Sequence, residues 1–379
     1  MSQPHATASP AAGPARIVDF ERNVYCIGGL PIDAIDLDHA VAKVRHAAHS
    51  NERCVIATPN LNFLVSSQTD PAFRDSVIGS DLCLADGMPL VWIARLLKLP
   101  IPGRVAGSEL FDRLMAQQGR PVTVFFFGGP PGAAGAACRA LEERAGGLRC
   151  VGYEEVPYAS VEALSADDVI ERVNRSKAEF VIVALGARKG QAWIEQNRAR
   201  LTAPVLCHLG AVINFAAGTV ARAPRPLQAL GLEWLWRIKE EPALWRRYAS
   251  DGRVFLEMLR KRVLPYAWRL RFGARDTRLD PAALEVQREA ARTCLLLRGA
   301  WTYDVLAPLR KACSAAAHDR TVLCIKLDEV THGDSAFVAV LMLALGAGKG
   351  NVGLANPTAP VRRVLRDWGA EFLLETSPA

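Results

Sequence analysis

The sequence lacks both a long uninterrupted apolar run and an export signal. No stretch of the 379 residues reaches the roughly 18 consecutive apolar residues of a membrane-spanning helix, and the nearest, 337–348, has the length of a buried core helix. Residues 1–15 have neither a basic start nor an apolar centre, so no signal peptide is expected, and we interpret 1–19 as a disordered tail. Half of the residues are apolar, which excludes a mostly disordered chain and predicts two or three folded domains.

Cysteine pairs with metal-binding or redox spacing are absent as well. The nine cysteines are odd in number and none belongs to a C-x-x-C pair, so neither a disulfide framework nor a zinc site is expected. Most of them lie in apolar runs, where we expect small core residues. This usage favours a cytoplasmic protein.

Acidic residues are outnumbered in one segment of an otherwise neutral chain. From Arg222 to Arg275 there are 13 Lys or Arg and 5 Asp or Glu, a net charge of +8, whereas the whole protein carries +7. Half of the eight tryptophans lie in this segment, at 234, 236, 245 and 268. Aromatic rings beside cations suit the headgroup layer of an anionic membrane, but they equally suit an amphipathic helix packed on its own domain. Because no nucleic-acid motif accompanies them, nucleic acid is not an expected partner.

Apolar runs alternate with helical patterns through the first 210 residues. We expect strands at 54–58, 82–85, 122–127, 180–185 and 205–209. We expect helices at 38–48, 107–117, 132–145, 167–176 and 191–200. Continuous apolar strands separated by helices predict a parallel sheet with helices on both faces, and ligands of such sheets bind at the carboxyl ends of the strands.

A second α/β pattern follows a linker-like stretch at 273–281. Strands are expected at 293–297, 322–327 and 352–355, and helices at 303–317, 334–345 and 357–368. About 100 residues suffice for a separate small domain.

Two strand ends of the first sheet carry polar residues. Thr58, Asn60 and Asn62 follow the first strand, where their side chains can hydrogen-bond a sugar or phosphate, or cap the next helix. Asp86 precedes a glycine after the second strand, a position that suits either a turn or a catalytic base.

Other motifs carry weaker signals. The loop Phe127–Gly132 could bring backbone N–H groups to a phosphate, but it is not a G-x-G-x-x-G, so an NAD-dependent oxidoreductase is a minor alternative. Asp36 and Asp38 resemble a D-x-D metal pair, yet they directly precede a helical pattern and are interpreted as capping acids. His208 lies in an apolar strand and is interpreted as a core histidine. No metal or cofactor is expected.

Taken together, residues 20–260 resemble the WecG/TagA/CpsF glycosyltransferases. The matching stretches are 58–60 (Thr-Pro-Asn), 85–91 (Ala-Asp-Gly-Met-Pro-Leu-Val), 127–132, 185–194, 217–224, 231–237 (Gly-Leu-Glu-Trp-Leu-Trp-Arg) and 241–248. The stretches after 217 are very specific. The resemblance implies a Rossmann-like domain at 20–220 and a basic helical appendage at 221–275.

The family resemblance also implies a reaction. Its members transfer a sugar, usually from a UDP-sugar, to a saccharide on a polyprenyl diphosphate at the inner membrane face, with inversion and without a D-x-D metal site, in surface glycan synthesis. By resemblance Asp86 is the general base. Substrate-binding residues are implied at Thr58, Asn60, Asn62, Gly128, Gly129, Gly186, Gln191, Arg222, Arg237 and Arg247. Whether the chain forms a homo-oligomer stays open.

Two departures from the family pattern motivate an alternative. The family's Pro-Lys-Gln-Glu string reads Arg-Lys-Gly-Gln at 188–191, and Asn214 replaces a usual Asp. A chain that has lost activity could serve as a scaffold that recruits partners through its C-terminal domain.

Residues 277–375 resemble the STAS domains of anti-sigma-factor antagonists more loosely. The matching stretch is 327–337, in which Ala336 stands at the usual phospho-acceptor position and Ser335 matches a serine that is not phosphorylated. We therefore expect a docking or regulatory module that binds a protein partner, not a phosphoswitch.

Overall fold

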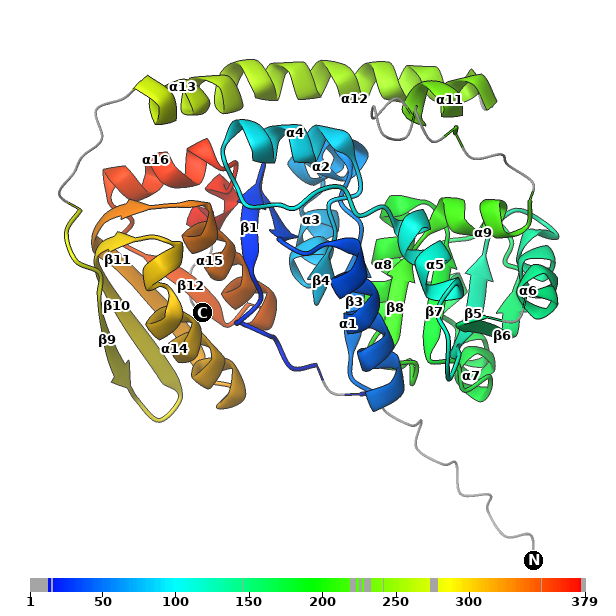
Figure 1. The fold of residues 1–379 in the computed structure, drawn as a ribbon. Coiled ribbons are helices and arrows are strands. Elements are labelled where there is room, and N and C mark those ends of the chain that lie inside the picture. Colours follow the sequence, from blue (N-terminus) through cyan, green and yellow to red (C-terminus); the bar gives the residue numbers. More distant parts are fainter. Residues whose placement is uncertain are drawn as a thin grey trace, which may run out of the picture. The chain divides into compact units, whose positions relative to one another are not determined.

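The described part of the chain forms two β-sheets and a hairpin (Figure 1). The computed structural model describes residues 13–14, 16–144, 146–218, 223–224, 227, 233–240, 242–272, 279–348 and 350–375, with only the backbone of Arg237 and Ala243. The predicted tail at 1–19 and linker at 273–281 therefore fall largely outside the described residues.

The larger sheet has six strands in the order β4-β3-β8-β7-β5-β6, and its recorded strand pairs are parallel, as predicted. The strands are β3 (Cys54–Ala57), β4 (Leu82–Cys83), β5 (Val122–Gly128), β6 (Leu148–Glu154), β7 (Phe180–Ala184) and β8 (Val205–His208). Sequence patterning missed β6. This edge strand mixes apolar and charged residues and is only partly buried, so it lacks the continuous apolar run of the central strands.

Helices connect these strands. They are α1 (Leu37–Ser50), α2 (Leu61–Thr69), α3 (Pro71–Ile78), α4 (Met88–Leu96), α5 (Gly107–Met115), α6 (Ala133–Glu143), η1 (Ala163–Ser165), α7 (Asp167–Arg175), α8 (Ala187–Asn197) and α9 (Gly210–Ala216). The five expected helices are present as α1, α5, α6, α7 and α8. At the start of α1, the backbone N–H of His39 donates to Asp36 (2.9 Å), so the interpretation of Asp36 as a capping acid is confirmed.

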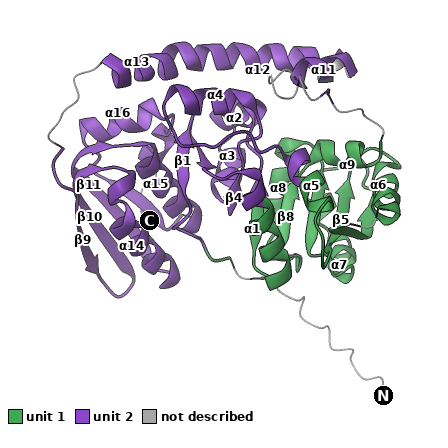
Figure 2. Ribbon diagram, viewed as in Figure 1, with its two compact units in different colours: residues 1–17, 41–55, 111–220 green, residues 18–40, 56–110, 221–379 purple. Residues whose placement is uncertain are grey.

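The chain divides into two compact units (Figure 2). Unit 1 comprises residues 1–17, 41–55 and 111–220, and unit 2 comprises 18–40, 56–110 and 221–379. In unit 1 the fully buried Trp193 stacks on Phe127, with ring centroids 4.1 Å apart, and its indole N–H donates to the Leu164 carbonyl. This aromatic pair fixes α8 against β5.

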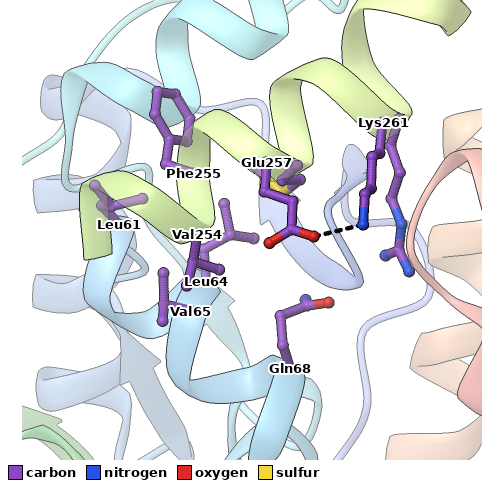
Figure 3. A pocket seen from close by; sticks show the side chains of 10 residues that line it. Leu61, Leu64, Val65, Gln68, Val254, Phe255, Glu257 and Lys261 are labelled. Carbon is purple, nitrogen blue, oxygen red and sulfur yellow. Dashed lines mark hydrogen bonds and ion pairs between the residues drawn. The ribbon is translucent and has the colours of Figure 1, made fainter. Parts of the chain in front are cut away.

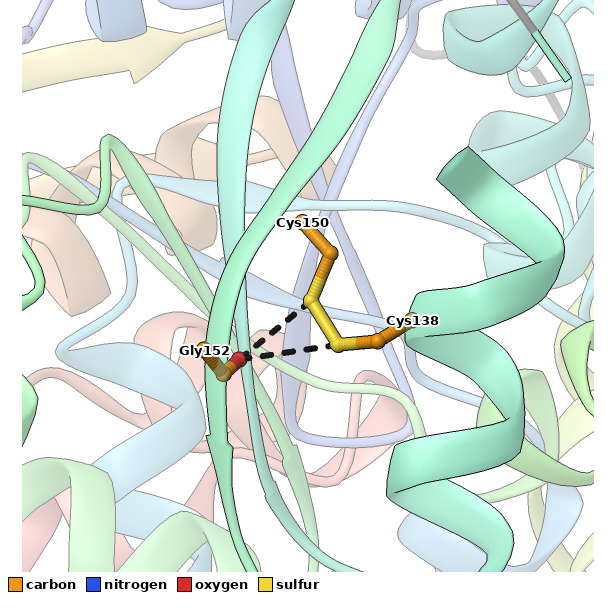
Figure 4. The surroundings of a disulfide bond; sticks show 3 residues. All are labelled: Cys138, Cys150 and Gly152. Atoms are coloured by element: carbon orange, nitrogen blue, oxygen red, sulfur yellow. Dashed lines mark hydrogen bonds between the residues drawn. A yellow bond between two sulfur atoms is a disulfide. The ribbon is translucent and has the colours of Figure 1, made fainter. Parts of the chain in front are cut away.

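One cysteine pair in unit 1 corrects an expectation. Cys138 of α6 and Cys150 of β6 form a disulfide, and both sulfur atoms lie near the Gly152 carbonyl oxygen (Figure 4). The expectation that no cysteine is paired is wrong here. The fold brings two Cα atoms 12 residues apart in sequence to 5.3 Å, which spacing alone does not reveal. The other seven cysteines are buried and form no disulfide.

The smaller sheet, in unit 2, forms a separate small α/β domain. Its order is β12-β11-β10-β9, with β9 antiparallel to β10 and the other pairs parallel. Its elements are β9 (Ala283–Arg288), β10 (Arg292–Trp301), η4 (Tyr303–Val305), α14 (Ala307–His318), β11 (Val322–Gly333), α15 (Ser335–Gly348), β12 (Val352–Ala355), α16 (Ala359–Asp367) and η5 (Glu371–Glu375). The three strands and three helices expected here are confirmed, and β9 was missed because it is largely exposed.

An N-terminal hairpin of β1 (Val24–Ile27) and β2 (Leu30–Asp33) packs against this small domain. The Ser335 hydroxyl donates to the Cys26 carbonyl (2.9 Å), and the Gly29 N–H donates to the Trp368 carbonyl (2.7 Å). Ser335 is 1 % exposed and the neighbouring Ala336 is fully buried. Both side chains are therefore part of the contact between the hairpin and the small domain or of the core beneath it.

The appendage is helical in its described part. It consists of α11 (Glu233–Glu240), η2 (Pro242–Leu244), α12 (Trp245–Met258), the π-helical turn η3 (Leu259–Val263) and α13 (Leu264–Phe272). Figure 1 shows α12, η3 and α13 as one continuous rod within unit 2. Two ion pairs join the rod to the small domain, Arg269 with Asp367 (2.5 Å) and Arg262 with Glu371 (2.9 Å). None of the described helices is long and apolar enough to cross a bilayer.

Candidate functional site

Asp86 lies just beyond the carboxyl end of β4. Its backbone N–H donates to the Pro59 carbonyl (2.8 Å), which holds the residue beside the start of α2. One carboxylate oxygen accepts the Gly107 N–H at 3.3 Å. The residue is half-buried, and withdrawal of its carboxyl group from water raises the pKa to about 7. A group with this pKa can accept a proton near neutral pH and release it again.

The electrostatics around Asp86 involve three residues that the sequence reasoning missed. Arg104, only 15 % exposed, forms ion pairs with Glu109 and with Glu233 of α11 (2.9 Å to the latter). Arg104 favours the charged form of Asp86, whereas Glu233 and Glu109 oppose it. The 129 residues between Arg104 and Glu233 explain why no local pattern could reveal this pairing.

The first predicted substrate-binding cluster lies near Asp86 in unit 2. Thr58 is buried directly after β3, and Asn60 is the N-cap of α2, where its side-chain oxygen accepts the Phe63 N–H at 3.2 Å. The Asn62 amide donates to the buried Asp251 of α12 (3.2 Å). The capping hydrogen bond gives a structural reason for an asparagine at position 60. The hydrogen bond from Asn62 to Asp251 joins the start of α2 to the appendage.

A second predicted cluster lies in unit 1, at the carboxyl ends of β5 and β7. Gly128 pairs with Ala184 across the two strands, and the Gly129 N–H donates to the Ala184 carbonyl (3.0 Å). Gly128, Gly129 and Gly186 all have positive φ, from 80° to 99°, which glycine adopts without strain. The Gly132 N–H at the start of α6 donates to the exposed Glu155 (2.9 Å).

Gly190, in the altered string at 188–191, packs directly against His208. A Cβ atom at Gly190 would lie 2.3 Å from Cδ2 of His208, so the histidine ring occupies the space that a side chain at 190 would need. Burial lowers the pKa of His208 to about 4, which makes it neutral at physiological pH. Its Nε2 and the side-chain nitrogen of the buried Gln191 have no hydrogen-bond partner among the described residues. The His208 residue is half-buried at the end of β8 and its Nε2 lacks a partner among the described residues, so its interpretation as a satisfied core histidine is not confirmed.

Replacing Gly190 with alanine is expected to destabilise the protein by about 1–3 kcal/mol, because the new methyl group would overlap the His208 ring. Alanine at the helical Gly252, where nothing lies within 4 Å, should instead stabilise by up to about 1 kcal/mol. Urea unfolding of both variants measures the difference. Adding His208→Ala to Gly190→Ala should recover most of the loss, and a Gly190→Ala protein as stable as the parent would contradict the overlap.

The three predicted appendage arginines are described to different extents. Arg247 of α12 is exposed, with its guanidinium 5.2 Å from the centre of the Tyr248 ring. Arg237 lies in α11, but its side chain is outside the described atoms, and Arg222 is outside the described residues altogether.

Comparison with known proteins identifies the family. The model of the glycosyl transferase WecG/TagA/CpsF family matches residues 25–267, and a Mlab, STAS domain model matches 284–375. The chain belongs to the WecG/TagA/CpsF family. It is therefore a glycosyltransferase that carries a C-terminal STAS domain. A relative from Bacillus spizizenii, described as N-acetylglucosaminyldiphosphoundecaprenol N-acetyl-beta-D-mannosaminyltransferase, is 26% identical over 212 residues, covering 55% of this chain and 80% of the relative.

Proposed function

We propose that this WecG/TagA/CpsF glycosyltransferase moves a hexosyl or N-acetylhexosaminyl group from a UDP-sugar to a saccharide carried on a polyprenyl diphosphate. The observation that carries the proposal is Asp86, a carboxyl group of pKa about 7 at the end of a parallel strand. The acceptor named in the description of the Bacillus spizizenii relative supports the lipid-linked acceptor. Surface glycan assembly at the inner face of the cell membrane is the proposed setting.

The proposed chemistry is a single displacement with inversion. Asp86 removes the proton of the acceptor hydroxyl, whose oxygen attacks the anomeric carbon while the bond to UDP breaks. One base suffices for this reaction, and Glu109 and Glu233, the other carboxylates beside it, are both paired with Arg104.

Substrate contacts are proposed from the two clusters and the appendage. Thr58, Asn60 and Asn62 are proposed to position sugar groups near Asp86 in unit 2. Gly128, Gly129, Gly186 and Gln191 are proposed as substrate-binding residues of unit 1. The departing diphosphate needs positive charge when no metal ion takes part, and Arg222, Arg237 and Arg247 are proposed to supply it.

Activity is expected to depend on the protonation of Asp86. Because the base must be ionised, kcat/KM should rise about tenfold per pH unit below pH 7 and level off above it. Arg104→Gln should move this midpoint to higher pH, because the cation that favours the carboxylate is lost while Glu109 and Glu233 remain. A pH–rate profile measures both. Identical midpoints in the two proteins would contradict the proposed coupling.

The appendage is the proposed membrane-contacting part. Large apolar side chains stand exposed along it, at Trp234, Leu235, Trp245, Leu256, Trp268 and Phe272. Trp268→Ala with Phe272→Ala should weaken binding to anionic vesicles by roughly tenfold, because two aromatic side chains no longer enter the headgroup layer. Vesicle sedimentation measures this. Equal binding of the variant and the parent would argue that the segment is only a packed helix.

One assay tests the proposed function directly. The purified protein is incubated with a panel of UDP-sugars and polyprenyl-diphosphate saccharides in the presence of EDTA, and mass spectrometry detects any extended lipid. A product formed despite EDTA supports transfer without a metal ion. If the folded protein yields no product with any donor and acceptor pair, the scaffold alternative is favoured. Partner binding by the 277–375 domain then tests that alternative.

A further inference from the structure

A groove with apolar walls runs between α2 and the appendage rod, with a volume of about 260 Å³ (Figure 3). Leu61, Leu64 and Val65 of α2 form one wall, and Val254, Phe255 and Met258 of α12 form the other. Polar residues lie at one end, where Glu257 and Lys261 form an ion pair (2.5 Å). We call this space the α2–α12 groove.

The hairpin turn at Gly28 lies close to one residue of each wall. Gly28, with a φ of +58°, lies so close that an added Cβ would stand 2.5 Å from Cδ1 of Leu64 and 3.4 Å from Sδ of Met258. The Gln68 amide donates to the Gly28 carbonyl (3.1 Å) and fixes the turn in this place. The hairpin turn, α2 and α12 all belong to unit 2.

The groove begins next to the base. Its first lining residue, Leu61, follows Asn60, and the Asn60 Cβ lies 3.4 Å from the position of a Cβ at Gly87, the neighbour of Asp86. At this end, the Asn62–Asp251 hydrogen bond holds α2 and α12 at their mutual distance. The apolar wall residues of α2 begin in the first turn of this helix, whose start lies beside Asp86. A molecule bound near Asp86 therefore lies about one helical turn from them.

The walls match a hydrocarbon chain. Their six apolar side chains offer no hydrogen bonds, so burying a polar ligand there would leave its groups unpaired. A thioether such as that of Met258 adapts its shape to a flexible apolar ligand. We propose that the α2–α12 groove binds the first isoprene units of the acceptor lipid while the saccharide end reaches Asp86. This inference rests on the proposed function, because it assigns a place to the lipid part of that acceptor.

Filling the groove tests the proposal. Val65→Trp and Val254→Trp should raise the KM for an undecaprenyl-diphosphate saccharide about tenfold, which corresponds to losing roughly two buried methylene groups. The KM for the same saccharide diphosphate on a methyl group, and the KM for the donor, should stay unchanged. Ala249→Trp, an exposed position on α12, is the matched control and should change none of them.

The two acceptors distinguish a lipid-binding role of the groove from an effect on the catalytic site. Equal losses with the undecaprenyl and the methyl acceptor would overturn the proposal, since the substitutions would then act through the catalytic site. No loss with either acceptor would place the lipid elsewhere. Circular dichroism verifies that each variant is folded.

A second measurement needs no turnover. Geranylgeranyl diphosphate carrying a diazirine should label α2 and α12 within 61–68 and 254–258, and unlabelled geranylgeranyl diphosphate should compete. Labelling elsewhere, or preferential labelling of these segments by a diazirine phosphatidylcholine vesicle without competition, would overturn the assignment. If labelling succeeds while the parent transfers no sugar, the proposed function fails and the groove assignment survives as a lipid site.

Discussion

Replacing Asp86 with asparagine is expected to lower kcat by about 10²–10⁴-fold, the range that general-base catalysis contributes. The asparagine side chain has the same shape and can still accept the Gly107 N–H, so the fold should persist. It cannot take up the proton of the acceptor hydroxyl. Rates with saturating donor and acceptor, together with circular dichroism, provide the measurement.

Asp38→Asn is the matched control for this variant. Asp38 lies in the first turn of α1, beside the helix-capping Asp36, and should leave kcat unchanged. If Asp38→Asn were inactive and Asp86→Asn active, the D-x-D metal reading would replace the proposed mechanism.

The largest expected stability effect comes from breaking a buried ion pair in unit 2. The guanidinium of Arg22 donates two hydrogen bonds to Asp33 (3.0 and 2.6 Å) and a third to the Ser80 carbonyl. Burial alone would lower the pKa of Arg22, but the carboxylate of Asp33 more than offsets it and raises the pKa. Arg22→Ala should cost about 3–5 kcal/mol, because Asp33 would remain as a buried charge without its cation.

Urea unfolding measures this loss, with Arg366→Ala as the control in the same unit. Arg366 is 68% exposed and its ion pair with Glu371 spans 3.7 Å, so its removal should change stability by less than about 1 kcal/mol. Similar losses for the two variants would mean that the Arg22–Asp33 pair adds nothing beyond a surface contact.

The central strands could be predicted because their environment imposes a simple pattern. β5 and β7 are covered on both faces and consist of nearly continuous apolar residues, so their sequences reveal them without knowledge of their neighbours. The hairpin could not be recognised in the same way. Each of its strands has only four residues, and their burial depends on the small domain more than 300 residues later.

The candidate site was predictable to a similar degree. Asp86 and Asn60 stand at strand ends, where a parallel sheet places its functional groups, and the family resemblance assigned a role to each. Arg104 and Asp251 were missed because their partners, Glu233 and Asn62, are 129 and 189 residues away in sequence. Sequence spacing reports local geometry, whereas these pairs arise only after the chain has folded.

The hairpin also sets an order of events during synthesis. The Cys26 residue is synthesised well before the two groups that bond to it, because Ser335 and Trp368 lie 309 and 342 residues further along the chain. The nascent hairpin therefore exposes its apolar face until these partners have been synthesised, a situation in which chaperones protect unpaired strands. Contacts of such long sequence separation slow folding, so the last step in maturing the enzyme is expected to be the closure of its C-terminal domain over its first strands.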